Sequence, residues 1–248
     1  MDPADTAPTW YWRIEPSKLR EAAEIRRRDP NDFASAVLTF FGFGGRDDGA
    51  AIAKMRAHPE GRRVLEERIP LPAGIMRPEI YASLPEDTLG HEYWKHCVEN
   101  GLDPMLISTQ SQAVAKRYPA TPDHAFVYDR YRDSHDLWHV LTGYGTDMAG
   151  EYGIIALQTR QAGYRAMAIT GFVSMLLTAL AERRPDMIGT WFEGRRRGRD
   201  GVYLLVEDWE SLVERPLHEV REQLRFAQAP DYRPFDYPRP EATPARAA

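Results

Sequence analysis

Two histidines and two acidic residues near the middle of the chain have types and a spacing that suit a divalent metal ion. His135 and His139 lie four positions apart, Asp136 lies between them, and Glu151 follows after eleven intervening residues. Residues four positions apart share one face of a helix, so two imidazoles at this spacing can bind a single cation. Two histidines and one or two carboxylates make a partly open metal site, with Asp136 as either a fourth ligand or an acceptor that orients a histidine.

Glycines mark the elements that would position these side chains. Gly143 and Gly145 interrupt the helix that carries the histidines, and a second helix is expected to begin near Gly150. Glu151 would then lie in the first turn of this second helix, where the helix dipole favours a carboxylate. The turn between the two helices can bring that carboxylate back beside the two imidazoles.

The histidine pair also has interpretations that involve no such site. Pairs at this spacing occur on ordinary helices, where the rings are solvated or hydrogen-bonded in a core. The acidic neighbours favour a metal, because Asp133, Asp136 and Asp147 crowd an otherwise apolar segment and buried carboxylates need cations or hydrogen bonds. The pattern is also similar to the metalloprotease motif His-Glu-x-x-His, but the shorter aspartate would reach a catalytic water less easily.

The fold class follows from the periodicity of the apolar residues. Helical spacing recurs along the chain and alternation with period two does not, so we expect an all-α fold, a single-domain multi-helix bundle with the metal motif on a central helix. Residues 1–29 are predicted to form an N-terminal extension, 30–226 the helical domain, and 227–248, rich in Pro and Ala, a disordered or extended tail. A helix that starts near residue 185 is expected to end near Gly194, and residues 201–206 are the best candidate for a strand.

Composition excludes several classes of protein. A net charge of -5 and a pI near 5.8 argue against a nucleic-acid binder, and Cys97 is the only cysteine, so no disulfide can form within the chain. The N-terminus has no apolar segment of the secretory type, and we expect a cytoplasmic protein. The longest apolar run, residues 166–181, is shorter than the roughly 18–20 residues of a membrane span. It predicts either a buried core helix or a helix that lines a lipid pocket or docks on a membrane.

At the histidine motif the chain resembles the coenzyme Q (ubiquinone) biosynthesis protein 4 family. The family signature is His-Asp-x-x-His, eleven residues and Glu, which here is His135, Asp136, His139 and Glu151 with no departure. The resemblance extends to the segments 80–93, 130–144, 150–152 and 216–224, and covers roughly residues 30–226.

The resemblance implies a role in ubiquinone biosynthesis. The expected activity is a metal-dependent oxidative decarboxylation, in which a hydroxyl replaces the C1 carboxyl of a polyprenylated hydroxybenzoate-derived ring. The alternative is a non-catalytic organiser that holds prenylated intermediates for other ubiquinone biosynthesis proteins. The four motif residues would be both the metal ligands and the catalytic residues, with zinc as the first choice of metal and iron or another divalent ion as the alternative. We also expect peripheral contact with the inner face of a membrane, and a homodimer is compatible with the resemblance.

Further residues are candidates for contact with such a substrate. Arg130 and Arg132 lie close to the motif and could meet a substrate carboxylate, or could equally pair with Asp129 or Asp133 as structural residues. The candidates for an apolar wall around the prenyl tail are Ile154, Leu157, Phe172, Met175 and Leu176.

Two features leave other functions open. The His135-Asp136 doublet also suits a helical phosphohydrolase, in which His91, His96 and Asp147 would supply the remaining ligands. The arginines at positions 195, 196, 197 and 199 are either a solvated helix end or a contact for anionic lipid headgroups.

Overall fold

Helices account for nearly all of the regular structure. The computed structural model describes residues 14–29, 32, 34–44, 48–117 and 121–235. Within these residues there are fourteen α-helices, two short 3-10 helices and no strand. The elements are α1 (Pro16–Arg28), α2 (Ala34–Gly44), α3 (Asp48–Ala57), α4 (Pro59–Glu66), α5 (Ala73–Met76), η2 (Pro78–Tyr81), α6 (Leu89–Asn100), α7 (Pro104–Ala115), α8 (Pro122–Asp133), α9 (His135–Thr142), α10 (Met148–Ala162), α11 (Arg165–Ala181), α12 (Asp186–Asp200), η3 (Leu204–Val206), α13 (Trp209–Leu212) and α14 (Leu217–Gln223). The prediction of an all-α single domain is confirmed.

Side-chain caps explain where several of these helices begin. Thr88, Asp103, Thr121 and Asp147 each accept a hydrogen bond from a backbone N–H of the following first turn. Such caps satisfy N–H groups that have no partner within the helix. Helix α10 begins slightly before the predicted Gly150 because Asp147 caps it.

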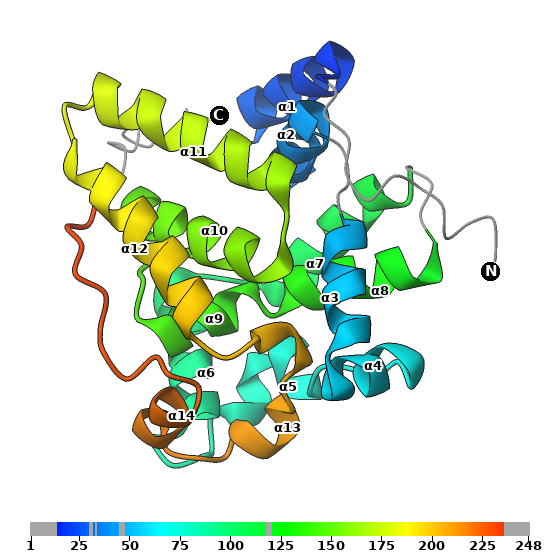
Figure 1. Ribbon diagram of the computed structural model, residues 1–248, viewed down its shortest axis with the longest axis vertical. Coiled ribbons are helices and arrows are strands. Elements are labelled where there is room, and N and C mark those ends of the chain that lie inside the picture. The colour runs from blue at the N-terminus through cyan, green and yellow to red at the C-terminus, as the bar shows by residue number, and fades with distance from the viewer. Residues whose placement is uncertain (1–13, 30–31, 33, 45–47, 118–120, 236–248) are drawn as a thin grey trace, which may run out of the picture.

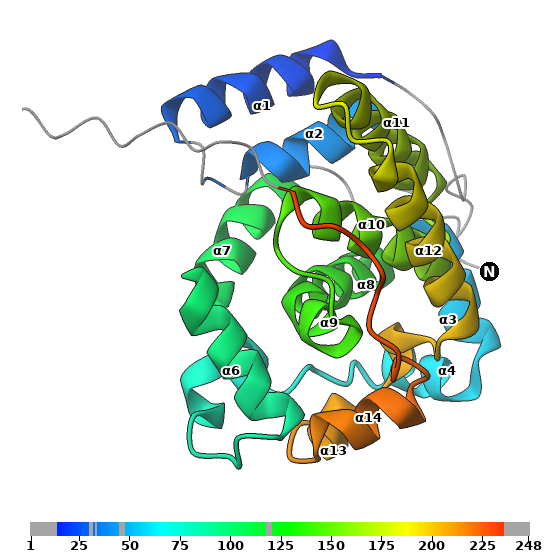
Figure 2. The same cartoon turned by 90° about the vertical axis from the view of Figure 1, so that its left-hand side faces the viewer.

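Helix α9, which carries both motif histidines, lies at the centre of the molecule. In Figure 2 it is surrounded by other helices, and it packs against α6, α8 and α14. Leu137, Trp138 and Leu141 of α9 have no exposed surface and belong to the largest apolar core. The helix is short because the chain breaks at Ser134, which separates α8 from α9.

Helices α10, α11 and α12 form the part of the molecule on the upper left of Figure 1. A Cβ at Gly194 would lie 2.3 Å from the carbonyl oxygen of Gly153, and one at Gly198 would lie 2.5 Å from that of Leu157. The glycines therefore let α12 approach the backbone of α10 closely. The prediction that α12 ends near Gly194 is wrong, since the helix continues through this contact to Asp200.

The predicted strand at residues 201–206 is also wrong. Its second half forms η3, and its backbone bonds to other parts of the chain: the Gln161 side chain accepts from Leu204 N and donates to the carbonyl of Val202. Val202 N donates to the carbonyl of Leu224. The side chain of Gln161 and the carbonyl of Leu224 thus supply backbone hydrogen bonds to this segment in place of a neighbouring strand.

The predicted N-terminal extension and tail are described in part. Helix α1 lies within the extension, and Ala22 packs in a core with Leu38, Phe41 and Val114. Residues 227–235 of the tail follow an extended path, and residues 1–13 and 236–248 lie outside the described residues.

Arg130 joins three separate parts of the chain. This buried side chain donates through Nε to the carbonyl of Leu205 at 2.6 Å, and through its two terminal nitrogens to those of Glu207 at 2.8 Å and Ile69 at 3.1 Å. Burial lowers the pKa of Arg130 to about 10, so the group remains charged at neutral pH.

We expect Arg130→Met to lower the free energy of unfolding by about 3 kcal/mol or more, because it leaves three carbonyls without a charged donor. The matched change Arg196→Met, at an exposed residue of α12 with only long ion pairs, should leave stability nearly unchanged. Denaturant titration of both variants checks this, and equal losses would contradict it.

Candidate functional site

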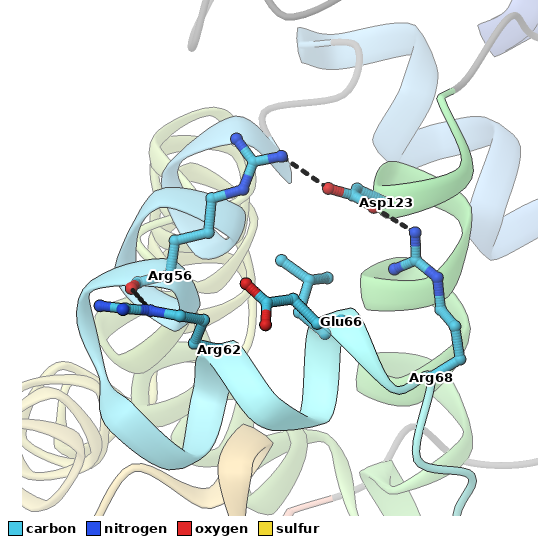
Figure 3. Close-up of a pocket in the computed structure, with 6 residues that line it drawn as sticks. Arg56, Arg62, Glu66, Arg68 and Asp123 are labelled. Atoms are coloured by element: carbon cyan, nitrogen blue, oxygen red, sulfur yellow. Dashed lines mark hydrogen bonds and ion pairs between the residues drawn. The ribbon is translucent and has the colours of Figure 1, made fainter.

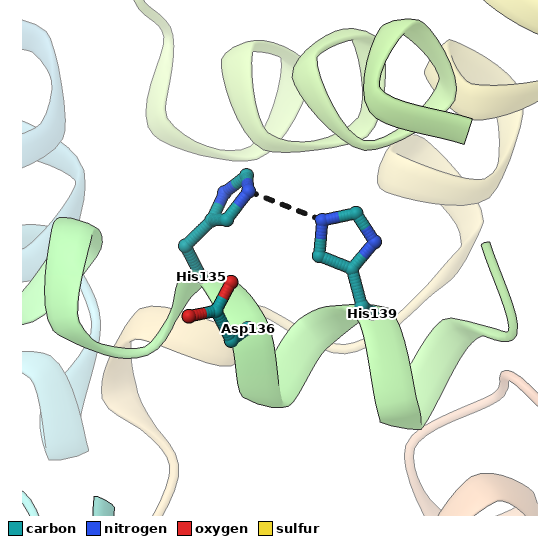
Figure 4. Close-up of side chains that lie close together, drawn as sticks. All are labelled: His135, Asp136 and His139. Carbon is teal, nitrogen blue, oxygen red and sulfur yellow. Dashed lines mark hydrogen bonds between the residues drawn. The ribbon is translucent and has the colours of Figure 1, made fainter. Parts of the chain in front are cut away.

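Three donor side chains from two helices converge at one point. His135 and His139 rise from one face of α9, one turn apart (Figure 4), and their Nε2 atoms lie 3.1 Å from each other. Glu151, in the first turn of α10, places one carboxylate oxygen 3.4 Å from His135 Nε2 and the other 3.4 Å from His139 Nε2. The turn between α9 and α10 therefore brings the carboxylate beside the imidazole pair.

The spacing of these donor atoms fits a small divalent cation. Ligands at about 2.0–2.1 Å from a tetrahedral zinc ion lie roughly 3.3 Å from each other, close to the spacings of 3.1 and 3.4 Å in this cluster. Ligand atoms of His135, Asp136 and His139 also lie within 4.8 Å of one another. The three nearest donors can thus share one ion, with Asp136 next to them.

Each imidazole is oriented by a hydrogen bond on its other nitrogen. His139 Nδ1 lies 3.0 Å from the carbonyl oxygen of Tyr144, and His135 Nδ1 lies 3.2 Å from Oε1 of Gln158. Both partners are acceptors, so the proton of each neutral ring belongs on Nδ1 and the Nε2 lone pair faces the cluster. Two lone pairs at 3.1 Å repel each other unless a proton or a cation lies between them.

The electrostatics of the cluster match this arrangement. Burial opposes ionisation of Glu151, but the two histidines outweigh it and hold the pKa of this carboxyl well below its usual range. Burial also opposes protonation of His135, but its hydrogen bond to Glu151 and the charge of that residue raise the pKa of His135 to about 9. Glu151 is therefore a carboxylate at neutral pH, as a metal ligand must be.

Two arginines hold the carboxyl end of α9. Arg221 donates to the carbonyls of Leu141 and Val140 at 3.0 and 2.8 Å, and Arg197 donates to that of Thr142 at 2.6 Å. The last carbonyls of a helix have no partner within it and carry partial negative charge, so buried cations stabilise them. Arg197 is buried, and this member of the arginine cluster has a structural role that neither interpretation of the sequence included.

A third histidine lies beside the cluster. The ring of His96, on α6, stacks on His139 with centroids 5.8 Å apart and planes at 19°, and its buried Nε2 has no hydrogen-bond partner among the described residues. Burial, followed by the charge of His139, lowers the pKa of His96. The sequence singled out this residue only as part of a phosphohydrolase set, and no local spacing could have placed it next to α9.

Asp147, another member of the phosphohydrolase set, has a different role. Asp147 caps α10, and its Oδ1 accepts from the backbone of Ala149 and Gly150 at 3.1 and 3.2 Å. Its other oxygen accepts from the hydroxyl of Tyr232 at 2.8 Å. The carboxylate that this interpretation needs as a ligand is thus used to start a helix.

The two arginines predicted to meet a substrate carboxylate have other partners. Arg130 bonds the three carbonyls described above. Arg132, also buried, donates to Asp129, to both oxygens of Asp133 and to Ser108, at 2.6–2.9 Å. The contacts of Arg132 agree with the structural alternative, whereas Arg130 binds backbone carbonyls in place of an aspartate.

The five apolar residues predicted to line one wall lie in different places. Ile154 and Leu157 are fully buried in the largest core. Met175 is fully buried in a second core between α10, α11 and α12, with Phe172 packed against it. Leu176 is partly exposed. The structure therefore does not bring the five together as a single wall, because successive residues of a helix face different neighbours.

Helix α11 has one buried face and one exposed apolar face. Gly171, Met175 and Ala179 are buried, whereas a row of apolar side chains on the opposite face is 45–69% exposed, and Phe192 of α12 is 58% exposed. The row, called here the α11 stripe, consists of Ile169, Val173, Leu177 and Leu180. Exposed Arg165 and Arg183 lie at its two ends. The buried face agrees with the interpretation as a core helix, and contact of the exposed face with lipid stays a prediction.

No helix among the described residues has the length and apolar character to cross a bilayer.

A hollow of about 580 Å³ lies at another place, between α3, α4 and α8 (Figure 3). Its lining is charged, and Asp123 binds both Arg56 and Arg68 across it. None of the candidate residues lines it, and its polarity does not suit a prenyl tail.

Comparisons with known proteins agree with the resemblance in the sequence. Residues 50–230 match the family model for "Coenzyme Q (ubiquinone) biosynthesis protein Coq4". The chain is 27% identical over 181 residues to "Ubiquinone biosynthesis protein COQ4, mitochondrial" of Lachancea thermotolerans, covering 72% of this chain and 53% of the relative. The protein of the same name from Candida glabrata is 29% identical over 180 residues, covering 72% and 52%. The chain thus spans about half the length of the curated relatives it matches.

A solved structure supports the fold. The crystal structure of a putative ubiquinone biosynthesis protein from Nostoc punctiforme superposes with a TM-score of 0.62 at 21% sequence identity. The match covers 87% of this chain and 100% of that one.

The cluster leads to a prediction about metal content. We expect one divalent cation per chain. His139→Ala or Glu151→Ala should weaken its binding by more than about 100-fold, because each removes a ligand, and the loss of a residue that only orients a ligand already costs about 10–100-fold. Both variants should fold, since a core of this size does not depend on a metal. Elemental analysis and competition with a chelator measure the affinity.

The matched control is His218→Ala, at an exposed histidine of α14, which should bind metal like the wild type. Equal metal in the wild type and in both ligand variants would refute the site.

Proposed function

Because the chain belongs to the coenzyme Q (ubiquinone) biosynthesis protein Coq4 family, we propose that it holds one divalent metal and acts on a prenylated precursor ring of ubiquinone. The observation that carries the proposal is the pair of Nε2 atoms of His135 and His139, which lie 3.1 Å apart and each 3.4 Å from an oxygen of the Glu151 carboxylate. A proton on His135 or a bound cation stabilises such a cluster, and the donor types together with their spacing favour a metal ion.

His135, His139 and Glu151 would hold the ion, and Asp136 would be a fourth ligand or an outer acceptor. Zinc fits the donor types and their spacing, and ferrous iron fits two histidines and a carboxylate as well. When bound, the ion would supply Lewis acidity towards the carboxylate and oxygen of the ring and, if it is iron, redox chemistry.

The proposed reaction replaces the C1 carboxyl of the ring by a hydroxyl. The bond from C1 to the carboxyl carbon breaks, carbon dioxide leaves, and a bond from C1 to oxygen forms, so the ring loses two electrons. We propose dioxygen as the acceptor: the acid, dioxygen and water would then give the phenol, carbon dioxide and hydrogen peroxide. Tyr144 and Gln158 would keep the two histidines oriented. His96, which stacks on His139, would border the bound substrate ring.

The α11 stripe favours a second candidate function, that of a lipid-binding organiser. A helix with an exposed apolar row and arginines at its ends is typical of segments that lie in the surface of a membrane. In this proposal the chain docks peripherally on a bilayer, binds prenylated intermediates there and presents them to other ubiquinone biosynthesis proteins. A homodimer formed through the same stripe is the competing explanation of its exposure.

Activity separates the enzyme from the organiser. Purified protein given iron or zinc, dioxygen and a prenylated C1-carboxylated ring should release the C1-hydroxylated product. His135→Ala should lose turnover by more than about 100-fold and still bind the tail, because each buried methylene contributes about 0.8 kcal/mol and the tail therefore dominates affinity. Mass spectrometry of the product and a binding assay with the same lipid provide the two readouts.

Binding without turnover under every metal tested would leave only the organiser. Turnover at the wild-type rate in both His135→Ala and Glu151→Ala would remove the cluster from the reaction.

The membrane contact has its own test. Leu177→Asp should reduce co-sedimentation with phospholipid vesicles by at least about tenfold, since burial of a leucine is worth roughly 1.5–3 kcal/mol and an aspartate cannot enter the apolar layer. Val98→Asp, at an equally exposed valine of α6, is the control and should bind vesicles normally. If Leu177→Asp binds vesicles normally but converts a dimer to a monomer, the stripe is an interface between two copies.

A further inference from the structure

The segment after α14 crosses the turn that joins the two helices of the site. Residues 227–235, called here the C-terminal strap, run from α14 past α9 and α10 (Figure 2, orange-red). Arg197 donates to the carbonyl of Gln228 at 2.6 Å, and Arg184 donates to that of Arg233 at 2.8 Å. Helix α12 and the residues before it thus anchor the strap along its length.

Tyr232 of the strap contacts both sides of the turn. Its hydroxyl accepts from Gly145 N at 2.8 Å and donates to Asp147 Oδ2 at 2.8 Å. Its ring packs on Tyr144, with centroids 5.4 Å apart. Phe235 N also donates to Asp147, at 2.8 Å.

The contacts of Tyr232 involve residues that orient the donor atoms of His139 and Glu151. The carbonyl of Tyr144 accepts from His139 Nδ1, and Asp147 caps the helix whose first turn carries Glu151. Tyr232 therefore touches one residue that orients a histidine and another that starts the helix of the carboxylate.

The turn is shaped to receive this hydroxyl. A Cβ at Gly145 would lie 2.9 Å from the Tyr232 hydroxyl oxygen, so only glycine lets the backbone approach it without a shift. Burial raises the pKa of Tyr232 to about 12 against the hydrogen bond from Gly145, helped by the hydrogen bond to Asp147 and the charge of that residue, so the hydroxyl keeps its proton at neutral pH.

We propose that Tyr232 is a positioning residue of the candidate site, which fixes the turn between α9 and α10 and thereby keeps His139 and Glu151 at the spacing that one metal ion needs. The inference rests on the proposed metal site. It concerns a residue beyond the match to the family model, which ends at residue 230.

The test is Tyr232→Phe, which removes one oxygen and keeps the ring against Tyr144. We expect the affinity for Co²⁺ and Zn²⁺ to fall by about tenfold, as for other groups that orient metal ligands. The visible absorption of bound Co²⁺ should also change, because the donor atoms are held in a different geometry.

The matched control is Tyr203→Phe, which removes a buried hydroxyl that has no hydrogen-bond partner among the described residues. Its metal affinity and Co²⁺ spectrum should equal those of the wild type. An unchanged affinity and spectrum in Tyr232→Phe would overturn the inference, as would an equal fall in Tyr203→Phe. A wild-type chain that binds neither ion would instead refute the proposed metal site on which the inference rests.

Discussion

Two imidazole nitrogens that face each other at 3.1 Å, next to the two oxygens of one carboxylate, set the constraint on which the surrounding structure depends. When acceptors hold the proton of each neutral ring on Nδ1, the two Nε2 lone pairs repel unless a proton or another cation lies between them. The carbonyl of Tyr144 and the amide of Gln158 are these acceptors. Against the opposing effect of burial, the hydrogen bond and the charge of Glu151 raise the pKa of His135 and favour a proton on this ring when no other cation is present.

Helix α9 could not hold this arrangement alone. Isolated helices of only two turns are unstable in water, because a helix gains stability only after several residues have been ordered. The apolar core buries Leu137, Trp138 and Leu141, and Arg197 and Arg221 bind the last three carbonyls of the helix. Tertiary contacts therefore supply what the short helix lacks, and they also fix the direction in which both histidines point.

The features that the sequence predicted correctly depend on residues close to one another in the chain. The four-residue spacing of His135 and His139 and the glycine at position 143 that ends their helix are both local signals. The all-α class followed from periodicity in the same way.

What the sequence did not predict depends on residues far along the chain. Arg130 was a candidate for substrate contact, yet its partners are the carbonyls of Ile69, Leu205 and Glu207. Gly194 was expected to end a helix, but it makes room for α10. In both cases the sequence drew attention to the residue but could not identify its partner. No pattern in the sequence shows which segment of backbone comes close to it in the folded chain.

The order of the supporting residues along the chain has a consequence for biosynthesis. Proteins are made from the N-terminus, and a nascent chain folds as its segments leave the ribosome. The histidines and Glu151 emerge well before Arg197, Arg221 and the strap, which bind α9 and the turn after it. The donor atoms can therefore reach their final spacing only after these later segments have left the ribosome, and a chain that stops before residue 221 would expose the apolar residues of α9 to chaperones and proteases.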